Sequence, residues 1–139
     1  MTLKCIIIDD EPIARKLLQE YIEETDFLTL VGSAENPLKA AGLISEFEPD
    51  LIFLDVNMPK MNGRETLQHI RNNRKWRHIP VAIFTTSANK DDIEFCKSFG
   101  SACITKPMSY ADFSDTLQKL FNQMIPPVRR GGEEVGSKK

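Results

Sequence analysis

Short apolar runs alternate along this chain with longer segments in which apolar residues return every three or four positions. A continuous apolar run is typical of a strand buried on both faces, and the longer period is typical of an amphipathic helix. The runs predict strands at LKCIII (3–8), FLTLVGSA (27–34), LIFLD (51–55), PVAIFT (80–85) and ACIT (102–105). The periodic segments predict helices at 13–24, 37–48, 63–73, 89–100 and 109–124.

The alternation of strands and helices, with short links between them, predicts the fold class. It is typical of an α/β domain in which helices cover both faces of a doubly wound, five-stranded parallel sheet. Right-handed crossovers leave few topologies for such a chain. Ligands of open α/β sheets bind outside the carboxyl ends of the strands, where the strand order reverses. The residues at the predicted strand ends are therefore the candidates for chemistry.

The length of 139 residues fits one domain, which we assign to residues 1–125. Residues 126–139 are rich in proline, glycine and charge and cannot bury an apolar face. We interpret them as a flexible tail, either a linker remnant or residues added by cloning. A linker remnant would once have led to a separate output domain.

Composition and charge narrow the class further. Apolar residues make up 41% and charged residues 27%, as in ordinary globular proteins. The net charge is −2, and the tail holds four Lys or Arg against two Glu, so residues 1–125 carry −4. An acidic body argues against direct nucleic-acid binding. No stretch approaches the roughly 20 apolar residues of a membrane helix, and the N-terminus does not resemble a signal peptide, so we expect a cytoplasmic protein without membrane attachment.

The three cysteines are Cys5, Cys96 and Cys103. They are odd in number, show no CxxC spacing and lie in apolar elements. We interpret them as reduced, buried thiols rather than as redox or metal-binding groups.

Polar and charged residues follow four of the predicted strands. Asp9 and Asp10 follow the first strand, Asp55 ends the third, Thr85 ends the fourth and Lys106 follows the fifth. Any one of them alone could be a strand-end residue or a helix cap. Because the carboxyl ends of parallel strands lie at one edge of the sheet, together they predict one site.

The residue types at this edge predict a metal-bound phosphate site. Carboxylates a few ångströms apart repel each other unless a cation joins them, and oxygen ligands with room for water suit Mg²⁺. No His or Cys stands at these strand ends, which disfavours zinc. A carboxylate beside Mg²⁺ can attack phosphorus and form an aspartyl phosphate, with Lys106 and Thr85 as donors to the phosphoryl oxygens. The sequence therefore predicts that Asp55 becomes phosphorylated.

Four segments together resemble the receiver domain of two-component response regulators: Asp9-Asp10, DVNMPKMNG around Asp55, FTTS (84–87) and TKP (105–107). The resemblance covers residues 3–124. It implies a flavodoxin-like sheet with strand order 2-1-3-4-5 and a phosphoryl group taken from a histidine kinase, a histidine phosphotransfer protein or a small acyl phosphate. It also implies a signalling domain of single-domain type, which catalyses only its own phosphorylation and dephosphorylation.

The resemblance also assigns the site residues. It makes Asp55 the phosphoacceptor, and Asp9, Asp10, Asp55 and the backbone carbonyl of Asn57 the Mg²⁺ ligands. Thr85 would be the switch hydroxyl. Lys106 would contact the phosphoryl group, and its peptide bond to Pro107 would be cis.

One position departs from the family. Cys103 stands where receivers carry a switch aromatic, which places the usual coupling between hydroxyl and aromatic in doubt. The resemblance further implies homodimerisation through the face formed by the predicted elements at 89–100, 102–105 and 109–124.

Two alternatives from other classes stay open. A haloacid-dehalogenase-like phosphatase also uses a strand-end aspartate, Mg²⁺ and a lysine, but its second acid would fall at Asn57. A pseudo-receiver would use the fold as a binding module without phosphorylation.

The basic segment RNNRKWRHIP (71–80) could form a docking or nucleic-acid patch. We favour the interpretation that its cations complement the dipole of a helix and that Trp76 covers the edge of the core.

Overall fold

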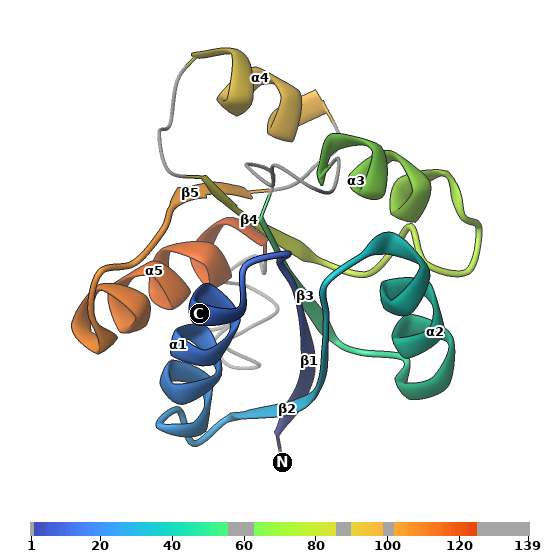
Figure 1. Cartoon of the computed structure of the whole chain (residues 1–139). Coiled ribbons are helices and arrows are strands. Elements are labelled where there is room, and N and C mark those ends of the chain that lie inside the picture. Colours follow the sequence, from blue (N-terminus) through green and yellow to red (C-terminus); the bar gives the residue numbers. More distant parts are fainter. Residues whose placement is uncertain (1, 56–62, 86–89, 99–101, 125–139) are drawn as a thin grey trace, which may run out of the picture. The chain divides into compact units, whose positions relative to one another are not determined.

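The computed structural model describes residues 2–55, 63–85, 90–98 and 102–124 (Figure 1). Contacts between Cα atoms divide the chain into two units, residues 1–106 and residues 107–139. The first unit contains the sheet and four helices, and the described part of the second contains one helix. We describe each unit by itself.

The elements alternate as predicted. The strands are β1 (Leu3–Ile8), β2 (Leu28–Ala34), β3 (Leu51–Asp55), β4 (Val81–Thr85) and β5 (Ala102–Thr105). The helices are α1 (Pro12–Glu23), α2 (Pro37–Phe47), α3 (Gly63–Asn72), α4 (Lys90–Ser98) and α5 (Tyr110–Met124). None of the helices within the described residues combines the length and the apolar composition that crossing a membrane requires.

All neighbouring strands are parallel, and their order is β2-β1-β3-β4-β5, which confirms the predicted fold class. The chain runs from the centre to one edge of the sheet and then returns past β1 to build the other side. The order therefore reverses between β1 and β3, whose carboxyl ends lie side by side. This is the position at which an open α/β sheet forms its ligand site.

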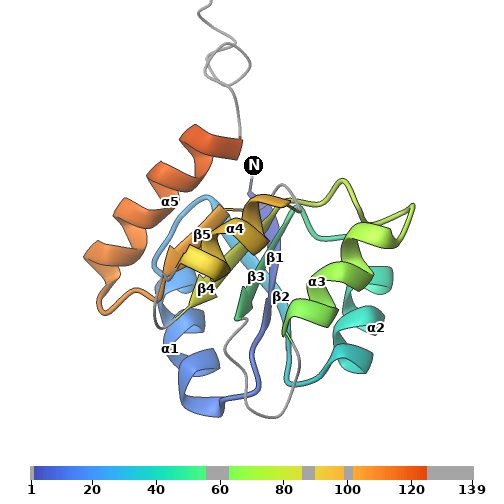
Figure 2. The same ribbon diagram turned by 90° about the horizontal axis from the view of Figure 1, so that it is seen from above.

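Helices cover both faces of the sheet in the first unit. In Figures 1 and 2, α1 lies on one side, and α2 and α3 lie next to each other on the opposite side. The core beneath α2 and α3 is formed by alternate residues of the central strands together with the inner faces of the two helices, including Ile6, Ile8, Ile52, Leu54, Ile83, Ile44, Leu67 and Ile70. Because β1 and β3 are central, their apolar runs are buried on both faces.

The opposite face of the sheet carries the other half of each apolar run. Ile7 and Phe53 are buried there, and the ring of Phe53 stacks on that of Phe84 with centroids 5.6 Å apart.

Cys5 is also fully buried. This burial raises the pKa of its thiol to about 12, and the charge of Asp50 contributes to the rise. Cys5 therefore stays protonated, which confirms the prediction for this cysteine. The side chains of Cys96 and Cys103 lie outside the described part of the chain.

Proline residues and polar capping side chains mark the starts of the helices. α1 and α2 both begin with proline, whose fixed backbone and missing N–H suit the first turn. The side chain of Asn36 caps α2 by accepting a hydrogen bond from the Lys39 N–H at 2.8 Å. In the second unit, the hydroxyl of Ser109 accepts from the Asp112 N–H at 3.1 Å, and the Asp112 carboxylate accepts from the Met108 N–H at 3.2 Å.

Glu48 ends α2 in a left-handed backbone conformation, with φ 47° and ψ 63°. Its N–H donates to the carbonyl of Ile44 at 3.0 Å, so this conformation closes the last turn of the helix. Glycine is the usual residue there, because a Cβ atom makes positive φ unfavourable. Pro49 adds to the cost, since a residue before proline prefers extended backbone. Glu48 is therefore a strained position.

We predict that Glu48→Gly raises the free energy of unfolding by about 1 kcal/mol, because glycine adopts positive φ without strain. Glu46→Gly is the matched control: Glu46 is also exposed but lies inside α2. The control should lose up to about 1 kcal/mol, the cost of glycine in a helix interior, because Glu46 lies in the last turn of α2. Urea denaturation of both variants measures the two effects. A loss of stability in both would contradict the assignment of strain to Glu48.

Candidate functional site at the carboxyl edge of the sheet

Asp9 and Asp55 meet at the point where the strand order reverses. Asp55 is the last residue of β3, Asp9 directly follows β1, and the two strands are in register at Ile8 and Leu54. The two aspartates are almost fully buried, with 3% and 4% of their surface exposed. Two carboxylates so placed need compensating positive charge or hydrogen bonds.

Lys106 supplies that charge from the end of β5. Its ammonium Nζ lies 2.6 Å from Oδ2 of Asp55 and 3.3 Å from Oδ2 of Asp9. The lysine side chain is itself only 26% exposed. One ammonium group therefore bridges two buried carboxylates, and three of the predicted site residues lie together.

Opposing effects act on the pKa values of Asp9 and Lys106. Burial raises the pKa of Asp9, and the charge of Asp55 adds to this, whereas the N–H of Glu11 and the ammonium of Lys106 act in the opposite direction. Burial alone would lower the pKa of Lys106, but its hydrogen bonds and attraction to Asp55 and Asp9 outweigh this and raise it. The lysine is thus held as a cation, while the ionised form of Asp9 stays costly.

The turn between β1 and α1 holds Asp9 from four sides. Its N–H donates to the carbonyl of Ala34 at 3.0 Å, and its Oδ1 accepts from the N–H of Glu11 at 3.0 Å. Its carbonyl oxygen accepts from the guanidinium of Arg15 at 2.7 Å, and Lys106 binds its Oδ2. The position of this carboxylate is therefore fixed before any ligand arrives.

Sequence reasoning missed Arg15. The available signal was a basic residue in the first turn of the helix that follows the acid pair. Because helical side chains tilt toward the N-terminus, such a residue can reach back to the preceding turn. Arg15 donates there to the main chain of Asp9 and adds a second positive charge on the acidic side of the site.

The remaining predicted residues are placed less completely. Asp10 follows Asp9 at the same strand end and is partly exposed. Thr85 ends β4 and pairs with Thr105 of β5, so its main chain lies at the predicted edge, but its side chain lies outside the described part of the chain, as does Asn57.

One expectation about the end of β5 is wrong. No peptide bond within the described residues is cis, so the bond between Lys106 and Pro107 is trans. The trans form is the one that a peptide bond before proline favours by default, by about 0.5–1 kcal/mol. Lys106 reaches both carboxylates with this bond trans.

The donor atoms fit a hard divalent cation. Among the described side chains, no group of three or more His, Cys, Asp or Glu residues forms an arrangement that holds a metal ion. The site nevertheless offers two buried carboxylates with a third beside them in sequence, and the buried pair requires positive charge. Carboxylate oxygens of this kind suit Mg²⁺ or Mn²⁺ and not a soft metal.

Comparison with known proteins agrees with this fold. The sequence profile of the response regulator receiver domain matches residues 5–118. The polar-differentiation response regulator DivK of Brucella ovis is 33% identical over 119 residues, which are 85% of this chain and 95% of DivK. A protein-glutamate methylesterase/protein-glutamine glutaminase of Trichodesmium erythraeum is 30% identical over 91% of this chain but only 36% of its own length. The chain thus spans about a third of the length of that relative.

Solved structures give the same result. The phosphorylated cyanobacterial phytochrome response regulator RcpA has a TM-score of 0.70 at 26% identity, covering 91% of this chain and 96% of RcpA. The Mn²⁺-bound form of the response regulator Rcp1 has a TM-score of 0.67 at 29% identity, covering 86% of this chain and 92% of Rcp1. This chain belongs to the receiver domain family of response regulators, the signalling domains of two-component systems.

We predict that Lys106→Met lowers the free energy of unfolding at pH 7 by about 2 kcal/mol, because it leaves two buried carboxylates without their shared cation. The loss should shrink as the pH falls toward the range in which Asp9 takes up a proton, since a neutral Asp9 removes the repulsion. Denaturant titrations at several pH values measure this, with Lys16→Met, at an exposed lysine, as the control. Equal stability of the two variants at all pH values would contradict the bridge.

Proposed function

We propose that this domain accepts a phosphoryl group on Asp55 in a Mg²⁺-dependent reaction and thereby switches its conformation. The observation that carries the proposal is the ammonium of Lys106, 2.6 Å from the carboxylate of Asp55 at the sheet edge where the strand order reverses. A cation already placed beside the acceptor oxygen can neutralise the charge that arrives with a phosphoryl group. The phosphorylated RcpA and the Mn²⁺-bound Rcp1 support the same chemistry for this fold.

The proposed reaction is an in-line transfer. A carboxylate oxygen of Asp55 attacks the phosphorus, the bond between phosphorus and the donor's imidazole nitrogen breaks, and the imidazole leaves with the electron pair. Asp9, Asp10, Asp55 and the backbone carbonyl of Asn57 would hold a Mg²⁺ ion, which when bound supplies positive charge to the phosphoryl oxygens. Lys106 and the hydroxyl of Thr85 would contact the other phosphoryl oxygens.

The ion pair of Lys106 suggests how phosphorylation would change the conformation of the domain. In the unphosphorylated domain the ammonium forms ion pairs with both Asp55 and Asp9. A phosphoryl group on Asp55 brings more negative charge and new acceptor oxygens, so the ammonium would move toward it. Such a change shifts an existing equilibrium: about 1.4 kcal/mol changes the ratio of two states tenfold, and nearly complete switching needs about 5.5 kcal/mol.

The partners follow from the donor chemistry. We propose that this domain acts in the cytoplasm, with a sensor histidine kinase or a histidine phosphotransfer protein as the donor and with partner binding or dimerisation as the output. The receiver would comprise residues 1–125, ahead of the tail at 126–139. The expected dimer face includes α5, which belongs to the second unit, so dimerisation stays a prediction.

The test is mass analysis after incubation with Mg²⁺ and either acetyl phosphate or phosphoramidate. We predict one phosphoryl adduct per chain, located on Asp55 by peptide mapping and lost when EDTA removes the metal. Asp55→Asn should abolish it. Asp26→Asn, at an exposed aspartate away from the site, should keep it.

The other outcomes separate the alternatives. No adduct with either donor, in a folded protein that binds Mg²⁺, would contradict the proposal and favour a pseudo-receiver that acts as a binding module. Sustained release of inorganic phosphate over many turnovers would favour the phosphatase.

A further inference from the structure

The link between α3 and β4, residues 73–80, is a firmly bonded turn. Within it, the N–H groups of Trp76 and Arg77 both donate to the carbonyl of Asn73, at 3.1 and 2.9 Å. From α3, the guanidinium of Arg71 donates to the carbonyl of Ile79 at 2.7 Å and to that of Arg77 at 3.2 Å. Arg71 is half-buried. The link therefore holds its side chains in fixed positions.

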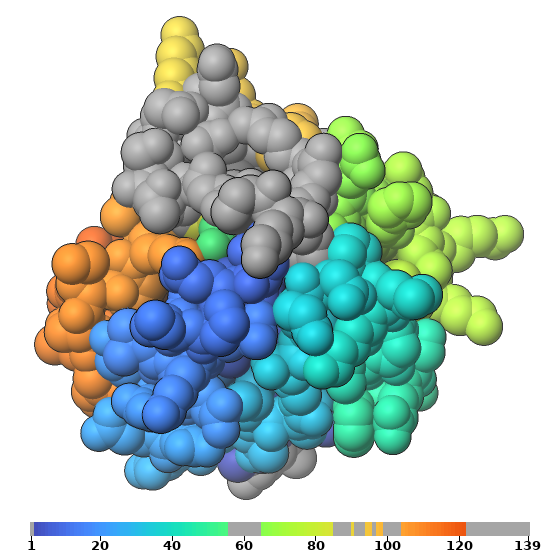
Figure 3. Space-filling model, viewed as in Figure 1, coloured from blue at the N-terminus to red at the C-terminus, as the bar shows by residue number. Residues whose placement is uncertain are grey.

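This link concentrates positive charge in an otherwise acidic chain. Residues 71–78 contain four Arg or Lys residues and no acid, whereas the whole chain carries −2. Arg71 is used internally, but Arg74, Lys75 and Arg77 are exposed. Figure 3 shows the yellow-green side chains of this region projecting from the side of the molecule that carries α3. Complementing the dipole of α3 does not require so many exposed cations.

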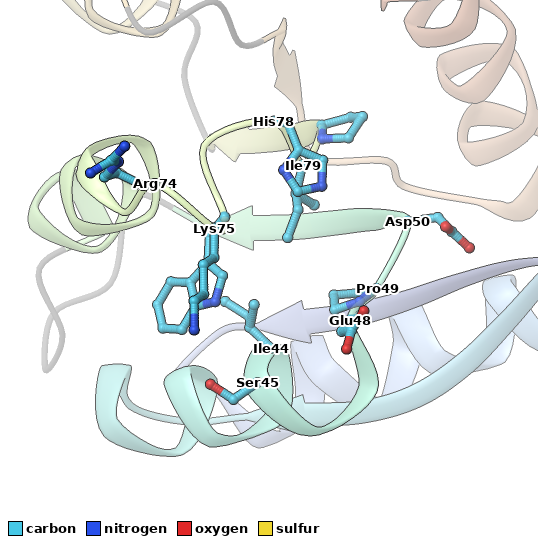
Figure 4. Close-up of a pocket in the computed structure, with 11 residues that line it drawn as sticks. Ile44, Ser45, Glu48, Pro49, Asp50, Arg74, Lys75, His78 and Ile79 are labelled. Atoms are coloured by element: carbon cyan, nitrogen blue, oxygen red, sulfur yellow. The ribbon is translucent and has the colours of Figure 1, made fainter.

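The cations border a pocket of about 850 Å³ at the amino edge of the sheet, away from Asp55. Figure 4 shows Arg74 and Lys75 on one side of it and Glu48 and Asp50 on the other. Asp50 is fixed there, because its Oδ2 accepts a hydrogen bond from the N–H of Lys4 at 2.8 Å. One wall of the pocket is thus positive and the other negative.

An apolar groove continues from this pocket between α2 and α3. The groove, of about 440 Å³, is lined mostly by apolar side chains, among them Leu38, Ala41 and Ile70. Trp76 and Ile44 line both the groove and the pocket, so the two are continuous. Leu38 is 86% exposed, an unusual position for a large apolar residue. Trp76 packs on the core as predicted, but it also forms the wall that joins the two hollows.

The shape and charge of this surface indicate its occupant. The residues of α2 that line the groove lie between Pro37 and Ile44, a span of about 12 Å or two helical turns. An apolar groove of this kind accepts the apolar stripe of an amphipathic helix. The cations at its end favour acidic residues on that helix. A nucleic acid has no apolar stripe to fill the groove, so its phosphates would contact only the basic end.

We propose that the surface formed by the α2–α3 groove and its basic end binds an amphipathic helix of a partner protein, with apolar residues along the groove and acidic residues against Arg74 and Lys75. The proposal does not depend on phosphorylation of Asp55. It gives the domain a docking surface on the side of the sheet that carries α2 and α3, with its charged end at the opposite edge from the phosphoacceptor.

Trp76 makes the proposal directly measurable, because it is the only tryptophan of the chain. The probe is a stapled helical peptide with leucine at every third or fourth position and glutamates at one end. We expect it to shift the emission of Trp76 on the unphosphorylated protein and to bind more weakly at high salt. A copy with lysine in place of glutamate, and a single-stranded oligonucleotide, should have no such effect.

Two variants test the two halves of the surface. Leu38→Asp removes the exposed apolar anchor in the first turn of α2, where an acid suits the helix, so the fold should be kept. Arg74→Glu with Lys75→Glu reverses the basic end. Each should weaken peptide binding about tenfold or more. The matched controls on α1, Ile13→Asp at a residue 79% exposed and Lys16→Glu, should leave it unchanged.

The proposal is overturned if the acidic peptide does not bind, if the lysine copy binds equally well, or if Leu38→Asp has no effect. Binding of the oligonucleotide in place of the peptide would reassign the surface to nucleic acid. None of these results would bear on phosphorylation of Asp55, because no phosphodonor is present.

Discussion

The pairing of one lysine with two buried carboxylates governs the chemistry of this domain. Asp9 and Asp55 lie at the reversal point of a parallel sheet, where burial makes negative charge costly, and Lys106 is the cation that offsets it. Because the ammonium of Lys106 contacts both carboxylates, it can move from one to the other when the charge on either changes. A ligand that brings a divalent cation or a phosphoryl group changes the charge on either side of Lys106. The ion pair therefore stabilises the site as it stands and would respond to a change in its charge.

The fold could be predicted from the sequence because its strands are continuous apolar runs. Runs such as LIFLD and VAIFT are apolar at every position before the last residue, which is typical of strands with helices on both faces. The site could be predicted for a related reason. Once the strands are parallel, their carboxyl ends share one edge, so Asp9, Asp55 and Lys106 were placed together without any knowledge of distances.

What the sequence could not predict depends on main-chain geometry. The position of Arg15 early in α1 indicated that it could reach back to the turn, but not which oxygen it would bind, because main-chain acceptors are present at every position. Glu48 in a left-handed conformation before a proline contradicts local preference, and it closes the last turn of α2 through its bond to Ile44. The trans bond before Pro107 is likewise a local backbone state, which the resemblance to a family described wrongly.

The first unit carries its two candidate binding surfaces in different places. Its carboxyl edge holds the buried charges that suit phosphoryl chemistry, and the surface between α2 and α3 ends in exposed cations at the amino edge. Both are positioned by bonds to the main chain, through Arg15 at one edge and Arg71 at the other. Two arginines thus fix the turns that carry the functional side chains, which explains how short links can present them in defined positions.

The central claim is that the ammonium of Lys106 offsets the cost of burying the carboxylates at this edge, and Asp9 can report it. The most direct measurement is a pH titration of the side-chain carboxyl ¹³C signals of aspartate in the wild type and in Lys106→Met. The account predicts that Asp9 titrates above its ordinary pKa of 3.8 in the wild type and higher still in the variant, because the variant loses a hydrogen bond and an opposite charge. An Asp9 that titrates at or below its ordinary value, or that does not respond to the loss of Lys106, would contradict it.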